Sequence, residues 1–424
     1  MITTGRDLNT GRLVAQYLKL KPGDRMYTAL PLYHGAGHGL CVKPSIYAGS
    51  AVIISRKFSH RTFWPEVHAS DANIIQYVGE LCRYLVNAPP HPLERKHKVH
   101  MAWGNGMRPD VWEVFRQRFN IPVIHELYAA TDGLGSSFNY NQGEFGRNAI
   151  GLRGLIWHLR NAKNEVRARV DVDTEEIMRD KNGFALKVDV NEPGEVLHRV
   201  DPEMAAAAFA GYYKSKNASC KRWIRDVFEK GDLYVFKPNA PPFNGSRKPE
   251  LTLRRWFRSG DVMREDKEGR VFFVDRLGDT FRWKSENVST NEVADVLGQY
   301  EQIREANVYG VQVPHADGRC GCAAIVMASG MTEDSFDFEG LTRYVVSTLP
   351  RYAVPIFLRM TGALQYTGTF KILKGQAKRE GVDLDLIEKS GSGDRVYWLP
   401  SNGKSYVPFR RRDWEALKGG QVRL

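Results

Sequence analysis

Strand-like and helix-like segments take turns along the first part of the chain, and this alternation restricts the fold more than any other feature. Apolar runs that predict strands lie at residues 25–32, 51–55, 74–78 and 123–126. Helical patterns lie at residues 63–68, 79–85 and 110–119, and Asp110 is expected to cap the last of them. Such alternation is typical of a mainly parallel sheet covered by helices, so we predict an α/β layer up to about residue 150.

Beyond the α/β layer the pattern changes to shorter and more charged segments. Strand-like pieces at residues 166–172, 184–189 and 195–200 predict a β-rich subdomain, and residues 239–245 have the composition of a loop. After a strand at residues 270–274, the sequence predicts a small α+β domain. Its helices are expected at residues 291–299 and 337–349, and its strands at residues 303–313, 322–327 and 356–360.

Length and charge narrow the function classes. At 424 residues the chain exceeds the roughly 150 residues of a typical domain, so we expect more than one domain. Its net charge of +12 favours acidic partners such as nucleotides, CoA, an anionic membrane surface or nucleic acid. Nucleic acid ranks last among these partners, because the basic residues are spread along the chain.

Cysteine spacing and apolar runs bear on the compartment. The five cysteines are scattered without paired spacing, so the pattern indicates neither a disulfide framework nor a zinc site, and a reducing compartment is expected. No apolar run approaches the ~18 residues of a spanning helix. We therefore expect any membrane association to be peripheral.

Residues 275–289, DRLGDTFRWKSENVS, place charges, aromatic side chains and a lone glycine between two regions that have the patterns of folded segments. We interpret this stretch as a hinge. It resembles the signature DR-x-GDTFRWKGENVST of the fatty acid transport protein and very-long-chain acyl-CoA synthetase family, a branch of the adenylate-forming enzymes, and departs from it at Ser285. The resemblance implies that Arg276 reaches the ribose of a nucleotide and that Leu277 and Gly278 absorb a backbone rotation.

A polar turn, YAATDG, follows one of the expected strands and lies at its carboxyl end, where open α/β sheets bind ligands. A tyrosine can stack on adenine, a threonine hydroxyl can hold a phosphate and an acid can ligate Mg²⁺, although the same residues also suit a structural turn. The turn resembles the family's YGATEG, with Ala129 in place of glycine and Asp132 in place of glutamate. The resemblance implies nucleotide contacts for Tyr128 and Thr131, a catalytic role for Thr131 and a metal contact for Asp132.

Further elements resemble nucleotide-binding motifs of the same family. WFRSGD resembles W-x-x-[ST]-G-D, which implies that Asp261 accepts hydrogen bonds from the ribose hydroxyls. A carboxylate suits a vicinal diol because it offers two acceptor oxygens and no competing donor. GNGMR resembles GNGLR, although read alone it is a simple turn. The resemblance implies that the adenine pocket is lined by Gly104, Asn105 and Gly106.

The remaining matches concern the acyl group and catalysis. YTGTFK resembles the family's terminal catalytic element, which implies that Lys371 is catalytic. When a carboxylate attacks the α-phosphorus of ATP, two anions meet, and a positive charge beside the forming bond stabilises the transition state. YTALPLYH also matches the family, which implies that His34 lines the acyl pocket. In the matching segment YVGELCRY we interpret Glu80 and Arg83 as structural ion-pair partners.

The resemblance extends over nearly the whole chain, but the family's phosphate-binding loop, YTSGTTGLPK, has no counterpart in it, so we expect an N-terminally truncated member. It implies that residues 1–276 are a remnant of the large AMP-binding domain, with a mainly parallel sheet followed by a β-rich part. Residues 277–424 would then be the small C-terminal α+β domain, a catalytic lid.

We therefore expect an ATP- and Mg²⁺-dependent ligase that converts a long-chain or very-long-chain fatty acid to acyl-CoA through an acyl-adenylate. A catalytically impaired protein that binds or transports fatty acids or nucleotides is the alternative. The expected partners are fatty acid, ATP and CoA, with peripheral membrane association and no nucleic acid. The expected location is intracellular, at a peroxisomal, endoplasmic reticulum or lipid-associated surface. The peroxisome is included because the final Val422, Arg423 and Leu424 approximate a peroxisomal tripeptide, with valine where a small residue is preferred.

Overall fold

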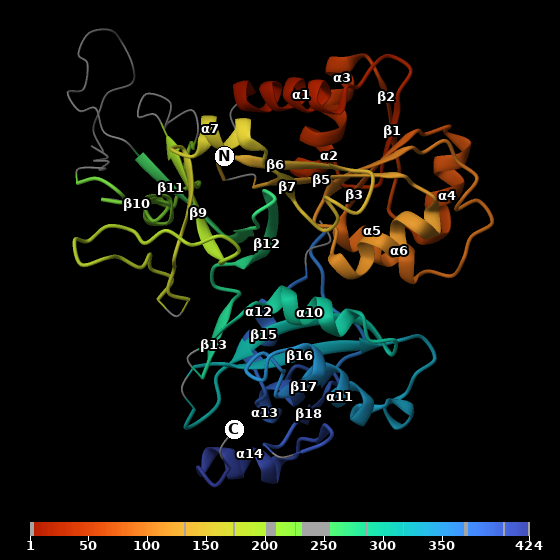
Figure 1. Cartoon of the computed structure of the whole chain (residues 1–424). Helices are drawn as coiled ribbons and strands as arrows, with labels where there is room; N and C mark the ends of the chain where they lie inside the picture. The colour runs from red at the N-terminus through yellow and green to blue at the C-terminus, as the bar shows by residue number, and fades with distance from the viewer. Residues whose placement is uncertain are drawn as a thin grey trace.

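The computed structural model describes residues 4–130, 133–172, 174–200, 209–224, 226–230, 255–284, 286–316, 318–368, 372–401 and 403–422. In these residues the strands form two six-stranded sheets, a five-stranded sheet and a two-stranded ribbon. Figure 1 shows the first sheet with its helices beside the second sheet, and the C-terminal sheet with its helices below both. No helix in this part of the chain combines the length and the apolar character that a bilayer crossing requires. The loop predicted at residues 239–245 lies outside the described residues, as do Arg423 and Leu424.

The first sheet confirms the predicted alternation of strands and helices. Its order is β2-β1-β3-β4-β5-β6, parallel from β2 to β5, with β6 antiparallel at one edge. The sequence analysis predicted neither β4 nor β6. The strands are β1 (Arg25–Thr28), β2 (Ala51–Ile54), β3 (Ile74–Val78), β4 (Met101–Asn105), β5 (Val123–Ala129) and β6 (Ser136–Asn141).

Helices cover both faces of the first sheet. α4, α5 and α6 pack on the face to which Tyr77 points, whereas α1 and the short π-helix η1 pack on the face to which Trp103 points. Both aromatic side chains are fully buried. The covering helices are α1 (Thr4–Leu18), α2 (Gly35–Gly37), η1 (His38–Val42), α3 (Lys43–Ala48), α4 (His60–Ala69), α5 (Gly79–Asn87) and α6 (Pro109–Phe119).

The start of α6 differs from the prediction, because Asp110 does not cap it. Arg108 occupies the cap position and proline follows it. Proline at the first helical position already has the φ angle of a helix and lacks the N–H that would need a partner. Asp110 instead accepts hydrogen bonds from the guanidinium of Arg83 at 2.8 and 3.1 Å.

The second sheet is antiparallel and confirms the predicted β-rich region. Its order is β7-β12-β11-β9-β8, with β10 paired to β11. The strand expected at residues 184–189 is wrong, since only isolated bridges such as Ala168↔Lys187 form there. The elements are β7 (Gly151–Leu152), α7 (Leu155–Asn161), β8 (Glu165–Ala168), β9 (Gly194–Val200), α9 (Lys216–Cys220), β10 (Trp223–Ile224), β11 (Arg255–Glu265) and β12 (Arg270–Arg276).

The C-terminal sheet has the order β15-β16-β17-β18-β19, and α10 and α11 pack on it. The predicted helices and strands of this region are confirmed to within a few residues. The division into two domains after residue 276 stays a prediction. The helices are α10 (Thr290–Gly298), η3 (Glu333–Ser335), α11 (Phe338–Thr348), α12 (Gly375–Glu380), α13 (Leu384–Lys389) and α14 (Arg411–Lys418). The strands are β13 (Phe281–Trp283), β14 (Glu286–Val288), β15 (Ile303–Val311), β16 (Cys320–Met327), β17 (Phe357–Met360), β18 (Arg395–Trp398) and β19 (Val407–Pro408).

Candidate functional site

The candidate site lies at the carboxyl ends of β4 and β5, which are adjacent in the first sheet. Gly104 and Asn105 end β4, and Tyr128 lies near the end of β5. Gly106 has a φ of 77°, which favours glycine. A Cβ atom on Gly79 would lie 1.7 Å from the carbonyl oxygen of Gly106, so the start of α5 is pressed against this loop. The structure thus brings the predicted adenine loop next to Tyr128.

Glu126 orders this loop, a role that the sequence analysis missed. Its carboxylate accepts hydrogen bonds from the backbone N–H of Gly106, from that of Met107 at 3.3 Å and from the hydroxyl of Tyr77. The side chain is fully buried, and burial raises the pKa of Glu126 to about 8, although the hydrogen bonds oppose this shift. An acid between the apolar residues Ile124 and Leu127 of a buried strand was the signal that could have identified it.

Asp261 joins the two large sheets at this point. Tyr128, on the first sheet, donates its hydroxyl to Asp261 Oδ2 at 2.5 Å. Asp261 and Arg276 are cross-strand partners on β11 and β12, and Arg276 Nε lies 3.8 Å from Asp261 Oδ1. Burial, and then the neighbouring carboxylate of Asp261, raise the pKa of Tyr128, so the tyrosine stays a hydrogen-bond donor. The residues predicted to hold the ribose are therefore in contact.

The predicted hinge follows Arg276 directly and is held by α12. The N–H of Leu277 donates to the carbonyl of Gly260 at 2.9 Å, and Gly278 has a φ of 87°. Lys378 donates to the carbonyl of Gly278 at 3.0 Å and to Asp279 at 2.7 Å. Burial alone would raise the pKa of Asp279, but the ammonium groups of α12 and its N-cap outweigh burial and lower it. Helix α12 thus contacts both the hinge and the acid that follows it. We call the described residues from 277 onwards the C-terminal unit.

Asp275, also missed by the sequence analysis, fastens the start of α10 to the end of β12. It accepts hydrogen bonds from the N–H and the hydroxyl of Thr290 at 2.6 and 2.8 Å, and from Asn291 at 3.0 Å. Lys374 donates to the hydroxyl of Thr290 at 2.8 Å. Burial raises the pKa of Asp275 and lowers that of Lys374, and the attraction between the two charges opposes both shifts.

The predicted catalytic and metal residues Lys371, Thr131 and Asp132 lie outside the described residues. The segment on either side of Lys371 is placed, since Tyr366 and Ile372 form a β-bridge. The hydroxyl of Tyr366 donates to Glu305 at 2.7 Å. These contacts fix both ends of the segment that carries Lys371.

The loop with His34 lies against the same segment. A Cβ atom on Gly368 would come within 2.7 Å of the hydroxyl oxygen of Tyr33. The half-buried His34 caps α2, because its Nδ1 accepts a hydrogen bond from the N–H of Ala36 at 3.4 Å. The structure therefore places the predicted acyl-pocket residue close to the terminal catalytic element.

A buried ionic network links the adenine loop to the C-terminal unit. Arg83 lies 3.6 Å from Glu80 and 2.8 Å from Asp110, which confirms the structural role predicted for Glu80 and Arg83. Arg108, which follows the adenine loop, donates from Nε to Asp295 on α10 at 2.6 Å. Burial raises the pKa of Asp295, and Arg108 opposes that shift. The orientation of α10 is thus coupled to the position of the loop.

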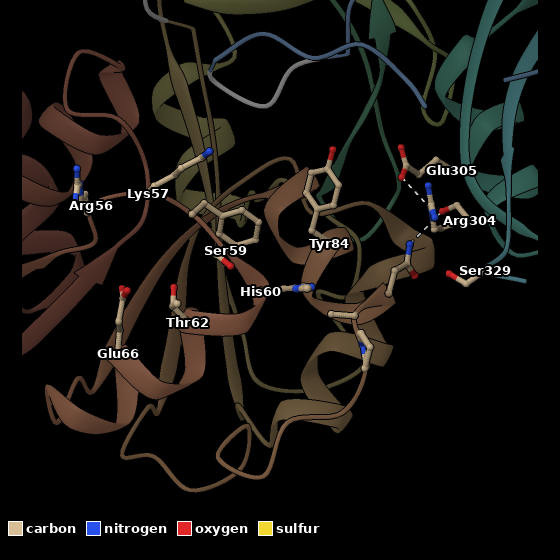
Figure 2. A pocket seen from close by; sticks show the side chains of 14 residues that line it. Arg56, Lys57, Ser59, His60, Thr62, Glu66, Tyr84, Arg304, Glu305 and Ser329 are labelled. Atoms are coloured by element: carbon tan, nitrogen blue, oxygen red, sulfur yellow. Dashed lines mark hydrogen bonds and ion pairs between the residues drawn. The ribbon is translucent and has the colours of Figure 1, made fainter. Parts of the chain in front are cut away.

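A cavity of about 760 Å³ separates the approach to α4 from the C-terminal sheet. Figure 2 shows Arg56 and Lys57 on one side of it and Arg304 on the other. The side chains of Arg56 and Lys57 have no ion-pair partner among the described residues. Glu66 accepts a hydrogen bond from Tyr27 at 2.8 Å. Glu305 accepts hydrogen bonds from Tyr366 at 2.7 Å and from Arg304 at 3.2 Å, so Arg304 is already paired. The cations Arg56 and Lys57, which are unpaired among the described residues, therefore make this side of the cavity suited to a negatively charged ligand.

Known proteins of similar sequence are AMP-binding enzymes and fatty acid transport proteins. The model of the AMP-binding enzyme family matches residues 1–200, and the model of the AMP-binding enzyme C-terminal domain matches residues 292–371. A very long-chain fatty acid transport protein of Cochliobolus heterostrophus is 56% identical over 100% of this chain and 62% of its own length. Isopenicillin N epimerase component 1 of Hapsidospora chrysogena is 40% identical over 99% of this chain and 66% of its own length. The chain thus spans less than two thirds of the length of each of these relatives.

Solved structures confirm the predicted fold class. The structure of an ATP-bound RpMatB-BxBclM chimera superposes with a TM-score of 0.66 at 17% identity. The match covers 89% of this chain and 64% of the chimera. At this identity the likeness concerns the fold, which is that of adenylate-forming enzymes.

The pKa of Glu126 leads to a prediction for Glu126→Gln. The folded protein holds the Glu126 proton up to about pH 8, whereas an unfolded glutamate loses it near 4.5. Wild type should therefore lose stability relative to the variant as pH rises through this window, by up to about 1.4 kcal/mol per pH unit. Urea unfolding of both proteins at several pH values measures this difference, and a difference that does not change with pH would contradict the assignment.

Proposed function

The chain belongs to the AMP-binding enzyme family, and from that membership we propose that it activates a long-chain or very-long-chain fatty acid as an acyl-adenylate and transfers the acyl group to CoA. The observation that carries the proposal is the contact of Tyr128 and Arg276 with Asp261, beside the adenine loop. The name of the 56% identical relative, a very long-chain fatty acid transport protein, supports the choice of acyl substrate.

In the first step the fatty acid carboxylate attacks the α-phosphorus of ATP and pyrophosphate leaves. Asp261 would accept hydrogen bonds from the ribose hydroxyls, because a carboxylate can accept about four hydrogen bonds and Tyr128 supplies one. Lys371 would place a positive charge beside the forming bond, where it stabilises the transition state more than the separated reactants. Glu126 would act as a positioning residue by fixing the adenine loop.

Mg²⁺ would enter with the phosphates of ATP. The described residues contain no group of three histidine, cysteine or acidic side chains that could hold a metal. Mg²⁺ usually binds through one or two protein carboxylates and the substrate's phosphates, which fits the single predicted carboxylate of Asp132. Its chemistry there would be to neutralise phosphate charge.

In the second step the CoA sulfur, after losing its proton, attacks the acyl carbonyl carbon and AMP leaves. CoA carries a diphosphate and a further phosphate, so it is strongly anionic. The cavity offers Arg56 and Lys57, cations that are unpaired among the described residues, on one wall, opposite Arg304, which is paired with Glu305. We assign it to the phosphates of CoA, because guanidinium and ammonium groups form strong charge-assisted hydrogen bonds with phosphate.

Between the two steps the C-terminal unit would rotate about Leu277 and Gly278. In the present orientation Arg108 contacts Asp295, and Asp275 accepts a hydrogen bond from the N–H of Thr290. Rotation has to break both contacts, because each joins residues on opposite sides of the hinge, and this makes it a transition between distinct arrangements. It would move Lys371 away from the adenylate and bring another face of the C-terminal unit to it.

Substitution Lys371→Ala tests the reaction. Wild type incubated with ATP, Mg²⁺, CoA and fatty acids of increasing length should release pyrophosphate and form acyl-CoA. The variant should lose adenylation by at least about 100-fold, because the charge beside the forming bond is gone. It should keep thioester formation from supplied acyl-adenylate. Lys389→Ala, at an exposed lysine of the same unit, is the matched control.

Equal loss of both steps in the Lys371 variant would contradict the role of Lys371 in adenylation. A wild type that binds AMP without turnover would favour the alternative, a catalytically impaired binding protein.

The double substitution Arg56→Ala/Lys57→Ala tests the cavity. The variant should raise the KM for CoA by about tenfold, because two cations that contact phosphate are removed, and should leave pyrophosphate release unchanged. It should also discriminate less between CoA and 3′-dephospho-CoA. Lys181→Ala/Lys267→Ala removes two exposed lysines elsewhere and serves as the control. An unchanged KM for CoA would mean that the phosphates of CoA bind outside this cavity.

A further inference from the structure

Helix α7 presents its apolar face to solvent, the reverse of an ordinary surface helix. Leu155, Ile156 and Leu159 are 76%, 67% and 77% exposed. At 100° per residue these side chains occupy one side of the helix, and the residues between them point the other way. Large exposed apolar side chains that gather on one face commonly mark an interaction site.

The inner face of α7 is fixed by polar contacts, so the helix cannot turn its apolar side inward without losing them. The guanidinium carbon of Arg153 lies 4.1 Å from the ring centre of Trp157. His158 Nε2 lies 3.0 Å from Glu265, which also accepts a hydrogen bond from Arg153 at 3.0 Å. These contacts hold α7 against the second sheet in the observed orientation.

The charge around the apolar face is positive. Arg160 and Lys163 are exposed beside it, and neither has an ion-pair partner among the described residues. The sequence has no acidic residue between Glu144 and Glu165. An apolar face with basic side chains beside it is complementary to a layer that is apolar inside and anionic at its surface.

The small area of the apolar face of α7 favours a bilayer over a protein as its binding partner. A stable protein interface buries about 800 Å² on each partner, far more than three side chains on a helix of seven residues can supply. A bilayer has no such requirement, because a few apolar side chains can insert among its headgroups while basic ones remain at the surface. The net charge of +12 favours the same partner.

We propose that α7 docks the protein on an anionic bilayer, with Leu155, Ile156 and Leu159 inserted at the interface and Arg160 and Lys163 against the lipid phosphates. The proposal rests on the exposure and charge of this helix and is independent of the ligase reaction. It assigns a surface and a partner to the peripheral membrane association that the sequence suggests.

Vesicle cosedimentation of the full chain tests the proposal. Wild type should bind vesicles of phosphatidylcholine with about 30% phosphatidylserine, and Leu155→Ser/Ile156→Ser/Leu159→Ser should bind them at least about tenfold more weakly. Arg160→Gln/Lys163→Gln should weaken binding to the anionic vesicles and leave binding to pure phosphatidylcholine unchanged. Ile46→Ser/Val190→Ser/Val346→Ser removes exposed apolar side chains from other surfaces, and this control should bind like wild type.

Several outcomes would overturn the proposal. Equal vesicle binding by wild type and the α7 triple variant would remove the helix from the membrane contact, and loss of binding in the control variant would show a nonspecific apolar effect. Wild type that binds no vesicles, but self-associates in sedimentation velocity through α7, would identify a second copy of the chain as the occupant. Because the exposed residues make no core contacts, circular dichroism of the variants should match wild type.

Discussion

One carboxylate, Asp261, connects the two large sheets, because it accepts a hydrogen bond from Tyr128 of the first sheet and faces Arg276 of the antiparallel sheet. The two sheets have separate cores, and they meet where Gly151 of β7 packs against Ser137 of β6 and where side chains such as Tyr128 cross between them. A buried carboxylate requires donors or cations, and here they come from both sheets. The group proposed to read the ribose therefore also holds together the walls of its own site.

Buried charged side chains also connect the two large sheets to the C-terminal unit. Arg108 follows the adenine loop and contacts Asp295 of α10, while Asp275 at the end of β12 holds the first residues of that helix. Buried ion pairs contribute little net stability, but an unpaired buried charge is costly. Such contacts favour discrete orientations over intermediate ones. This property suits a unit proposed to change its position between two chemical steps.

The sequence predicted the elements that have strong local patterns. β3 and α10 were located to within a residue or two, because apolar spacing is strong there. β4 was missed because its last residues, Gly104 and Asn105, are typical of a turn. Glu126 was missed for a different reason, since it contacts the loop from 20 residues away in the sequence. The outward apolar face of α7 was equally hidden, because burial is decided by tertiary packing and cannot be read from an amphipathic pattern alone.

The most direct test of the proposed nucleotide site is whether binding depends on the two ribose hydroxyls. Isothermal titration of the chain with AMP and with 2′,3′-dideoxy-AMP compares two ligands that differ only in the hydroxyls assigned to Asp261. AMP should bind, and the dideoxy compound should bind at least about tenfold more weakly, because its complex would leave the buried carboxylate of Asp261 without the two hydroxyl donors. Equal affinity for the two ligands would contradict the assignment of Asp261, and with it the proposed nucleotide site.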